Sequence, residues 1–138
     1  MIQVHEIVAY VVVGLFALGW IWGLGAMVSK RGPGERYWLW LTAVQVALGV
    51  QALLGIALFE TGHRVDAGSS LSNSLHYVYG VLPVVLLVFA HVIAREGNAG
   101  MVGFDTKKVL APWVPFAWAS FICFGLTLRA LMTGLGVG

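Results

Sequence analysis

Four apolar stretches dominate this sequence, and each is near or above the roughly 20 residues that a helix needs to cross a bilayer. They run over residues 7–28, 37–59, 75–94 and 109–132. Only 10% of the 138 residues are charged, against about 25% in a typical soluble domain, so little of the surface can face water. The sequence therefore predicts an all-α fold, a single transmembrane domain over residues 1–138. Its four helices would form an integral membrane bundle that runs up, down, up and down.

Lysine and arginine are divided unequally between the two ends of this bundle. Two fall on one side, at Arg64 and Arg129. The other six lie in the loops after the first and third stretches: Lys30, Arg31, Arg36, Arg95, Lys107 and Lys108. Because cytoplasmic loops carry the excess of such residues, both termini are predicted on the outer side. The lipid bilayer is the expected partner, whereas a net charge of only +2 with no basic, aromatic-interleaved stretch predicts no nucleic-acid partner.

Small residues four positions apart indicate where helices pack closely. Gly19 and Gly23 form such a pair in the first stretch, and Ala119 and Cys123 form another in the fourth. Pairs of this kind allow backbones to approach one another within a membrane. At the start of the third stretch, Asn73 or Ser74 is the predicted helix cap.

Three of the four histidines fall at the outer end of the predicted bundle. His5 opens the first stretch, His63 lies in the outer loop and His76 opens the third stretch. Imidazole is a usual axial ligand of haem iron in helical bundles, and two such side chains are enough for one haem. Arg129, in the last outer turn of the fourth stretch, suits a haem propionate because its planar guanidinium matches a carboxylate. We therefore expect a haem b site at this end.

His91 differs because it lies inside the third stretch, where an ionisable side chain normally faces a partner, a cavity or a cofactor. It follows His76 by 15 residues, which on a helix is a rise of about 22 Å and a net rotation of about 60°. The two therefore look toward a similar side from opposite leaflets, with Gly80 between them. Two histidines placed this way on one of four helices resemble the small four-helix membrane b-type cytochromes. That resemblance implies electron transfer, with His76 and His91 each serving one haem, although no second span carries a matching pair of histidines.

An inner haem at His91 would lack a second histidine from its own chain. Its other ligand would be Met27, or the His91 of a second copy in a homo-oligomer, or none if the iron is five-coordinate. In the alternative interpretation, His91 binds no cofactor and donates one hydrogen bond, either to a carbonyl or to Gln45 or Gln51.

The same histidines are compatible with other functions. Together with Glu60 or Asp66, the outer histidines His5, His63 and His76 are of the types that bind zinc or copper, as in a protein that handles metal ions. His91 is a further candidate metal ligand. The HExxH and CxxC spacings are absent, however. The outer histidines can also be interfacial anchors, and Arg129 can reach for the outer headgroups. The chain would then be a structural or assembly subunit of a larger membrane complex, with no cofactor.

The segment Thr61-Gly62-His63-Arg64, followed by Leu75-His76-Tyr77-Val78-Tyr79-Gly80, is similar to what some bacterial membrane proteins carry. The similarity implies a bacterial cytoplasmic membrane. An electron carrier placed there would exchange electrons with a quinone or with a larger redox complex. The chain contains no Walker loop, dinucleotide fingerprint or Ser–His–Asp arrangement, so hydrolysis and phosphoryl transfer are not expected.

Overall fold

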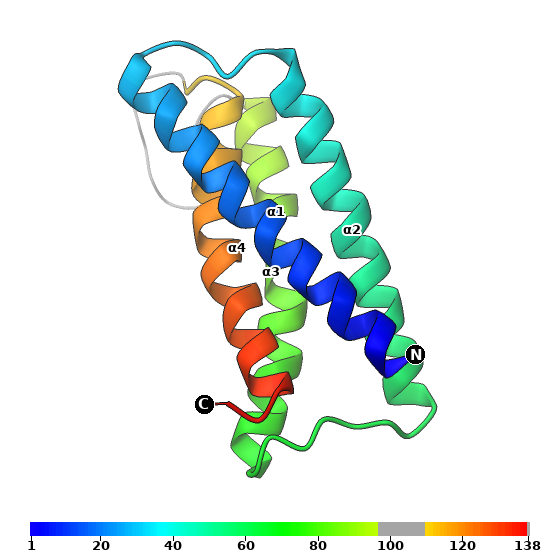
Figure 1. The fold of residues 1–138 in the computed structure, drawn as a ribbon. Coiled ribbons are helices and arrows are strands. Elements are labelled where there is room, and N and C mark those ends of the chain that lie inside the picture. Colours follow the sequence, from blue (N-terminus) through cyan, green and yellow to red (C-terminus); the bar gives the residue numbers. More distant parts are fainter. Residues whose placement is uncertain (97–109, 138) are drawn as a thin grey trace.

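The computed structural model of this chain describes residues 1–96 and 110–137. Within those ranges it holds four α-helices and no strand: α1 (Ile2–Ser29), α2 (Glu35–Glu60), α3 (Ser70–Glu96) and α4 (Trp113–Gly134). Successive helices run in opposite directions, so both ends of the chain lie at one end of the bundle (Figure 1). We call this the outer end, and we call the end with the loop between α1 and α2 the inner end. The predicted all-α fold is confirmed.

Each of the four described helices is long and apolar enough to cross a membrane. At a rise of about 1.5 Å per residue, even α4, with 22 residues, is about 33 Å long, against about 30 Å of hydrocarbon. α1, α2 and α3 extend beyond the predicted spans; α1 begins at Ile2 and α3 at Ser70. The predicted start of the fourth span, Val109, and the predicted inner cations Lys107 and Lys108 lie outside the described residues.

α3 begins earlier than predicted because Ser69 caps it. Its Oγ accepts the backbone N–H of Ser72 at 3.1 Å, which satisfies one of the free donors of the first helical turn. Asn73 and Ser74, the predicted caps, lie inside the helix: Asn73 Oδ1 accepts a loop N–H at 2.6 Å, and Ser74 Oγ donates to a helix carbonyl at 3.0 Å. That prediction was wrong. As a consequence, His76 lies well inside α3, about 9 Å from its first residue rather than at its opening.

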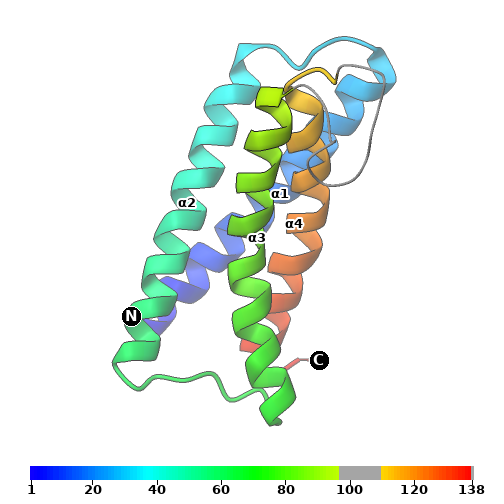
Figure 2. The ribbon, with the colours of Figure 1, turned by 180° about the vertical axis from the view of Figure 1, so that it is seen from behind.

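The four helices do not pack equally on one another. α4 lies against both α1 and α3, whereas α2 packs mainly on α1 and touches α3 over a short stretch only. α1 crosses the bundle obliquely, from the outer half of α2 to the inner half of α4 (Figures 1 and 2). The N-terminal turns of α1 are therefore placed close to α2 at the outer end.

The predicted small-residue pairs lie at helix contacts. The indole ring of Trp40 on α2 occupies the position that a Cβ at Gly19 would need. A Cβ at Gly23 would lie 2.5 Å from the Cβ of Ala117 on α4. The second predicted pair is buried on α4: Ala119 and Cys123. Close approach of α1 to its two neighbours thus depends on two glycines that the sequence singles out.

Candidate histidine site

Two of the predicted histidines meet at the outer end of the bundle. His5 comes from α1 and His76 from α3, and their ring centroids are 6.5 Å apart with an angle of 58° between the ring planes. Both side chains are partly buried. The expected convergence of outer histidines is therefore present in the structure for this pair.

His76 is held by the backbone of α4. Its Nδ1 lies 3.0 Å from the carbonyl oxygen of Ala130 and 3.4 Å from Thr133 Oγ1. A carbonyl oxygen only accepts, so Nδ1 is the protonated nitrogen and Nε2 keeps its lone pair. The ring also lies against Gly134, where a Cβ would come within 3.1 Å of His76 Cε1. An imidazole that ligates a metal almost always donates its other N–H in this manner, which fixes both the tautomer and the ring orientation.

His5 is held from the opposite side, by α2. Its Nε2 lies 3.3 Å from Gln51 Nε2, and its Cε1 would be 3.4 Å from a Cβ at Gly55. The other polar atom of each of these two side chains, His5 Nδ1 and Gln51 Oε1, is buried without a hydrogen-bond partner. Buried polar atoms are normally paired with protein or water, and each exception calls for a physical explanation.

His63, the third outer histidine, lies in the loop after α2. Its Nδ1 is 3.1 Å from Thr61 Oγ1. The ring is exposed and borders an outer depression of about 290 Å³, lined by Met1, Ile2, Gln3, Leu58 and His63. Across the described residues there is no group of three or more His, Cys, Asp or Glu side chains that could hold a metal ion.

The predicted acidic partners in the outer loop have other local contacts. Asp66 Oδ1 accepts the backbone N–H of Gly68 at 3.2 Å, and Glu60 is the exposed last residue of α2. Arg129 is exposed on α4, one residue before the Ala130 carbonyl that anchors His76. The arginine thus adjoins, in sequence, the residue whose carbonyl contacts His76.

At the inner end, the contacts of His91 agree with the alternative interpretation, in which it binds no cofactor and makes a hydrogen bond. Its Nδ1 lies 2.8 Å from the carbonyl oxygen of Leu87, one turn back, and its Nε2 lies 3.4 Å from Gln45 Nε2. The ring of Phe116 packs edge-on against the imidazole of His91, with 4.7 Å between the two ring centroids. The sequence offered both glutamines as partners for His91; the structure pairs Gln45 with His91 and Gln51 with His5.

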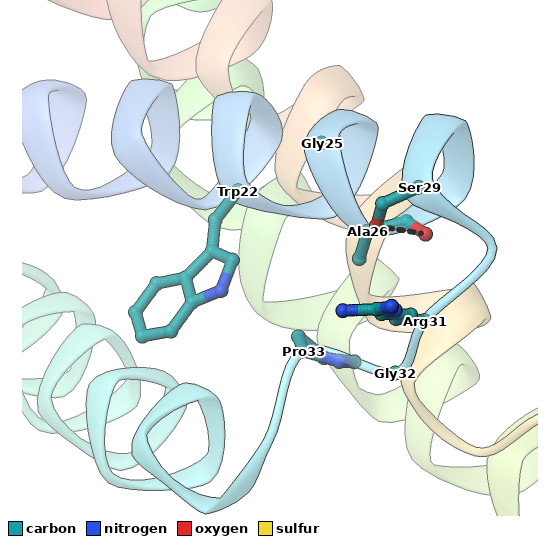
Figure 3. A pocket seen from close by; sticks show the side chains of 7 residues that line it. All are labelled: Trp22, Gly25, Ala26, Ser29, Arg31, Gly32 and Pro33. Carbon is teal, nitrogen blue, oxygen red and sulfur yellow. Dashed lines mark hydrogen bonds between the residues drawn. The ribbon is translucent and has the colours of Figure 1, made fainter.

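A second depression, also of about 290 Å³, lies at the inner end beside the loop that follows α1. Its lining residues are Trp22, Gly25, Ala26, Ser29, Arg31, Gly32 and Pro33 (Figure 3). Ser29 Oγ donates to the Ala26 carbonyl at 3.3 Å across this lining. None of the four histidines contributes to it.

Sequence reasoning missed three parts of the outer site. The first is the Ala130 carbonyl, which any residue type can supply and which therefore leaves no signal in the sequence. The second and third are Gly55 and Gly134, whose missing Cβ atoms leave room beside His5 and His76. In the sequence, Gly55 is one of many glycines within apolar spans. Only its position beside His5 of α1 distinguishes it from the others.

In comparisons with protein families, curated proteins and solved structures, none matches this chain.

Proposed function

We propose that this protein is an integral membrane carrier of electrons that binds haem b at the outer end of the bundle, between His5 and His76. Haem supplies one-electron redox chemistry when bound. The chain's own contribution is to hold the two imidazoles in place and to surround the site with apolar helices.

The spacing of the two imidazoles carries the proposal. With metal–nitrogen bonds of about 2 Å, imidazoles on opposite sides of one ion have ring centroids about 6 Å apart; the observed separation is 6.5 Å. Haem iron takes four nitrogens from its porphyrin, so two axial imidazoles complete its coordination. The limited contact between α2 and α3 supports the fit. So does the space at Gly80, one turn from His76, where a Cβ would have no atom of the described residues within 4 Å.

The same proposal includes the membrane setting. Four helices of sufficient length and apolarity support insertion in a bilayer. The excess of Lys and Arg in the loops after the first and third spans favours both termini on the outer face. A bacterial cytoplasmic membrane is proposed from the similarity of the outer-loop segment and the start of α3 to bacterial membrane proteins. In that orientation the histidine pair lies in the outer leaflet. Arg129 would serve a propionate there, and electrons would pass to or from a quinone or a larger redox complex.

For His91 the contacts favour the structural alternative over a second haem. Both of its ring nitrogens already have neighbours within 3.4 Å, one in its own helix and one on α2. We propose that this histidine helps to join α2 to α3 at the inner end, since these two helices have few contacts with each other.

The proposal is tested by a reduced-minus-oxidised visible spectrum of the detergent-purified protein, with pyridine haemochrome quantification. We expect a Soret and an α band with close to one haem per chain. His76→Ala should abolish or at least halve bound haem, whereas the matched variant His63→Ala should leave it unchanged, because His63 lies in an exposed loop.

A colourless protein from haem-competent cells would exclude the haem proposal. The structural or assembly subunit, and a zinc- or copper-handling protein, would then be the functions to test by partner capture and metal analysis. Loss of haem in His63→Ala with retention in His76→Ala would place the ligands elsewhere in the outer end.

A further inference from the structure

We infer that the two imidazoles present different nitrogens to the haem iron, His76 its Nε2 and His5 its Nδ1, and that Gln51 is the residue that selects the nitrogen of His5. This inference rests on the proposed haem site. Its first half, which concerns the tautomers of His5 and His76, involves the protein alone.

The edge of His5 that faces α2 is already in use. Gln51 lies at 3.3 Å from Nε2, and Gly55, one turn later on the same face of α2, lies beside Cε1. Nδ1 is the ring nitrogen that is left buried and without a partner. This holds for either orientation of the Gln51 amide, because whichever of its two polar atoms faces His5, the contact is made at Nε2.

The orientation of the Gln51 amide determines the tautomer of His5. If Gln51 Oε1 faces the ring, it accepts the Nε2–H bond and leaves a lone pair on Nδ1. That lone pair is what a metal ion requires, since a ligating imidazole is neutral at the bound nitrogen. His5 would then hold the iron through Nδ1 and would keep its proton on Nε2. The structure places Gln51 Nε2 toward the ring, so the inference takes the amide in its other orientation, in which Gln51 acts on His5 as the Ala130 carbonyl acts on His76.

The two anchors act on opposite nitrogens. The Ala130 carbonyl holds Nδ1 of His76 at 3.0 Å, and Gly134 lies beside the same edge of that ring. The nitrogen that remains free is therefore Nε2 in His76 and Nδ1 in His5. One imidazole is held by α4 and the other by α2, with the free nitrogens belonging to rings 6.5 Å apart.

The protein-only half is tested by ¹⁵N NMR of ring-labelled histidine in the haem-free, micelle-bound protein, with His5→Ala and His76→Ala used for assignment. We expect protonated Nε2 and unprotonated Nδ1 for His5, and the reverse for His76. Finding the same tautomer in both residues would overturn the inference.

The haem half is tested with Gln51→Leu, and its matched control is Gln45→Leu on the same helix. Loss of a group that orients a metal ligand typically lowers affinity about 10–100-fold, so Gln51→Leu should weaken haem binding by that factor. Gln45→Leu should leave it unchanged, because Gln45 contacts His91 at the inner end. Gln51→Glu keeps an acceptor for Nε2–H and should restore the affinity with a lower midpoint potential.

The two proposals fail separately. A protein without haem whose histidines show the expected tautomers would contradict the function and keep the assignment of nitrogens. A protein with haem in which Gln51→Leu and Gln45→Leu bind it equally well would keep the function and remove Gln51 as the selecting residue.

Discussion

Replacement of Gly23 by alanine should destabilise the bundle, because this glycine sets the distance between α1 and α4. A Cβ at this position would lie 2.5 Å from Ala117 Cβ and 3.2 Å from Ala117 Cα. Carbon atoms in ordinary contact are about 3.5–4.0 Å apart, so the two helices would have to separate locally by about 1 Å. Overpacking of this kind costs about 1–3 kcal/mol. The helix propensity of alanine over glycine returns about 1 kcal/mol, which leaves a net loss of up to about 2 kcal/mol.

The assay is reversible unfolding of the micelle-bound protein by sodium dodecyl sulfate, followed by far-ultraviolet circular dichroism. Gly25→Ala is the matched control, because Gly25 is exposed on the same helix and a Cβ there meets nothing within 4 Å. This control should be neutral or slightly stabilising. In the double variant Gly23→Ala/Ala117→Gly, the Cβ contact is removed, so the double-mutant cycle should give a favourable coupling of about 0.5–3 kcal/mol. Equal stability of Gly23→Ala and Gly25→Ala would refute the packing argument.

Three further predictions address the site and the orientation. Gly134→Ala should weaken haem binding about 10-fold or more, because the new Cβ would lie 3.1 Å from His76 Cε1. The control is Gly125→Ala, where a Cβ meets no described atom within 4 Å. Equal affinities of the two variants in a haem titration would contradict the expectation. His91→Ala should keep the full haem content in the pyridine haemochrome assay, and loss of a spectrally distinct haem would restore the inner site. In a Cys123→Ala background, a membrane-impermeant maleimide should label Ser70→Cys but not Ser29→Cys on intact cells, and the reverse pattern would invert the proposed orientation.

The four helices and their alternation were predictable because each depends on one segment at a time. A helix that crosses hydrocarbon must be apolar over its whole length, so span positions follow from the sequence directly. Alternation then places His5 and His76 at the same end without further information. The small-residue pairs were predictable for a similar reason. Few residue types other than glycine allow a contact with a neighbouring helix as close as those at Gly19 and Gly23.

The partners of the histidines were not predictable, because they depend on how helices rotate and cross. Gln45 and Gln51 are six residues apart, which on a helix places them about 120° from each other around the axis. One therefore faces α3 and the other α1, and the oblique path of α1 brings His5 to the second. Nothing in an apolar span indicates which of its faces meets which neighbour. Two glutamines that look alike in the sequence thus have different partners.

Polar groups in these helices are satisfied in two ways, either within one helix or between helices. Ser120 and Thr127 donate to carbonyls of their own helix, each at 2.7 Å, and these two hydrogen bonds join no two helices. Apart from a sulfur contact between Cys123 and Pro83, the side-chain hydrogen bonds between described helices all involve a histidine.

Of the four buried side-chain atoms without a partner among the described residues, two belong to the contact between His5 and Gln51. An unpaired polar atom in a membrane interior costs several kcal/mol. His91 and His76 avoid that cost through their neighbours, whereas His5 Nδ1 does not. The other two unpaired atoms, the Tyr37 hydroxyl oxygen and Trp40 Nε1, lie near the inner end and belong to side chains other than histidine. A bound metal at His5 Nδ1 would satisfy the one histidine nitrogen among the four, and this is the physical reason to look for a metal ligand at the outer end.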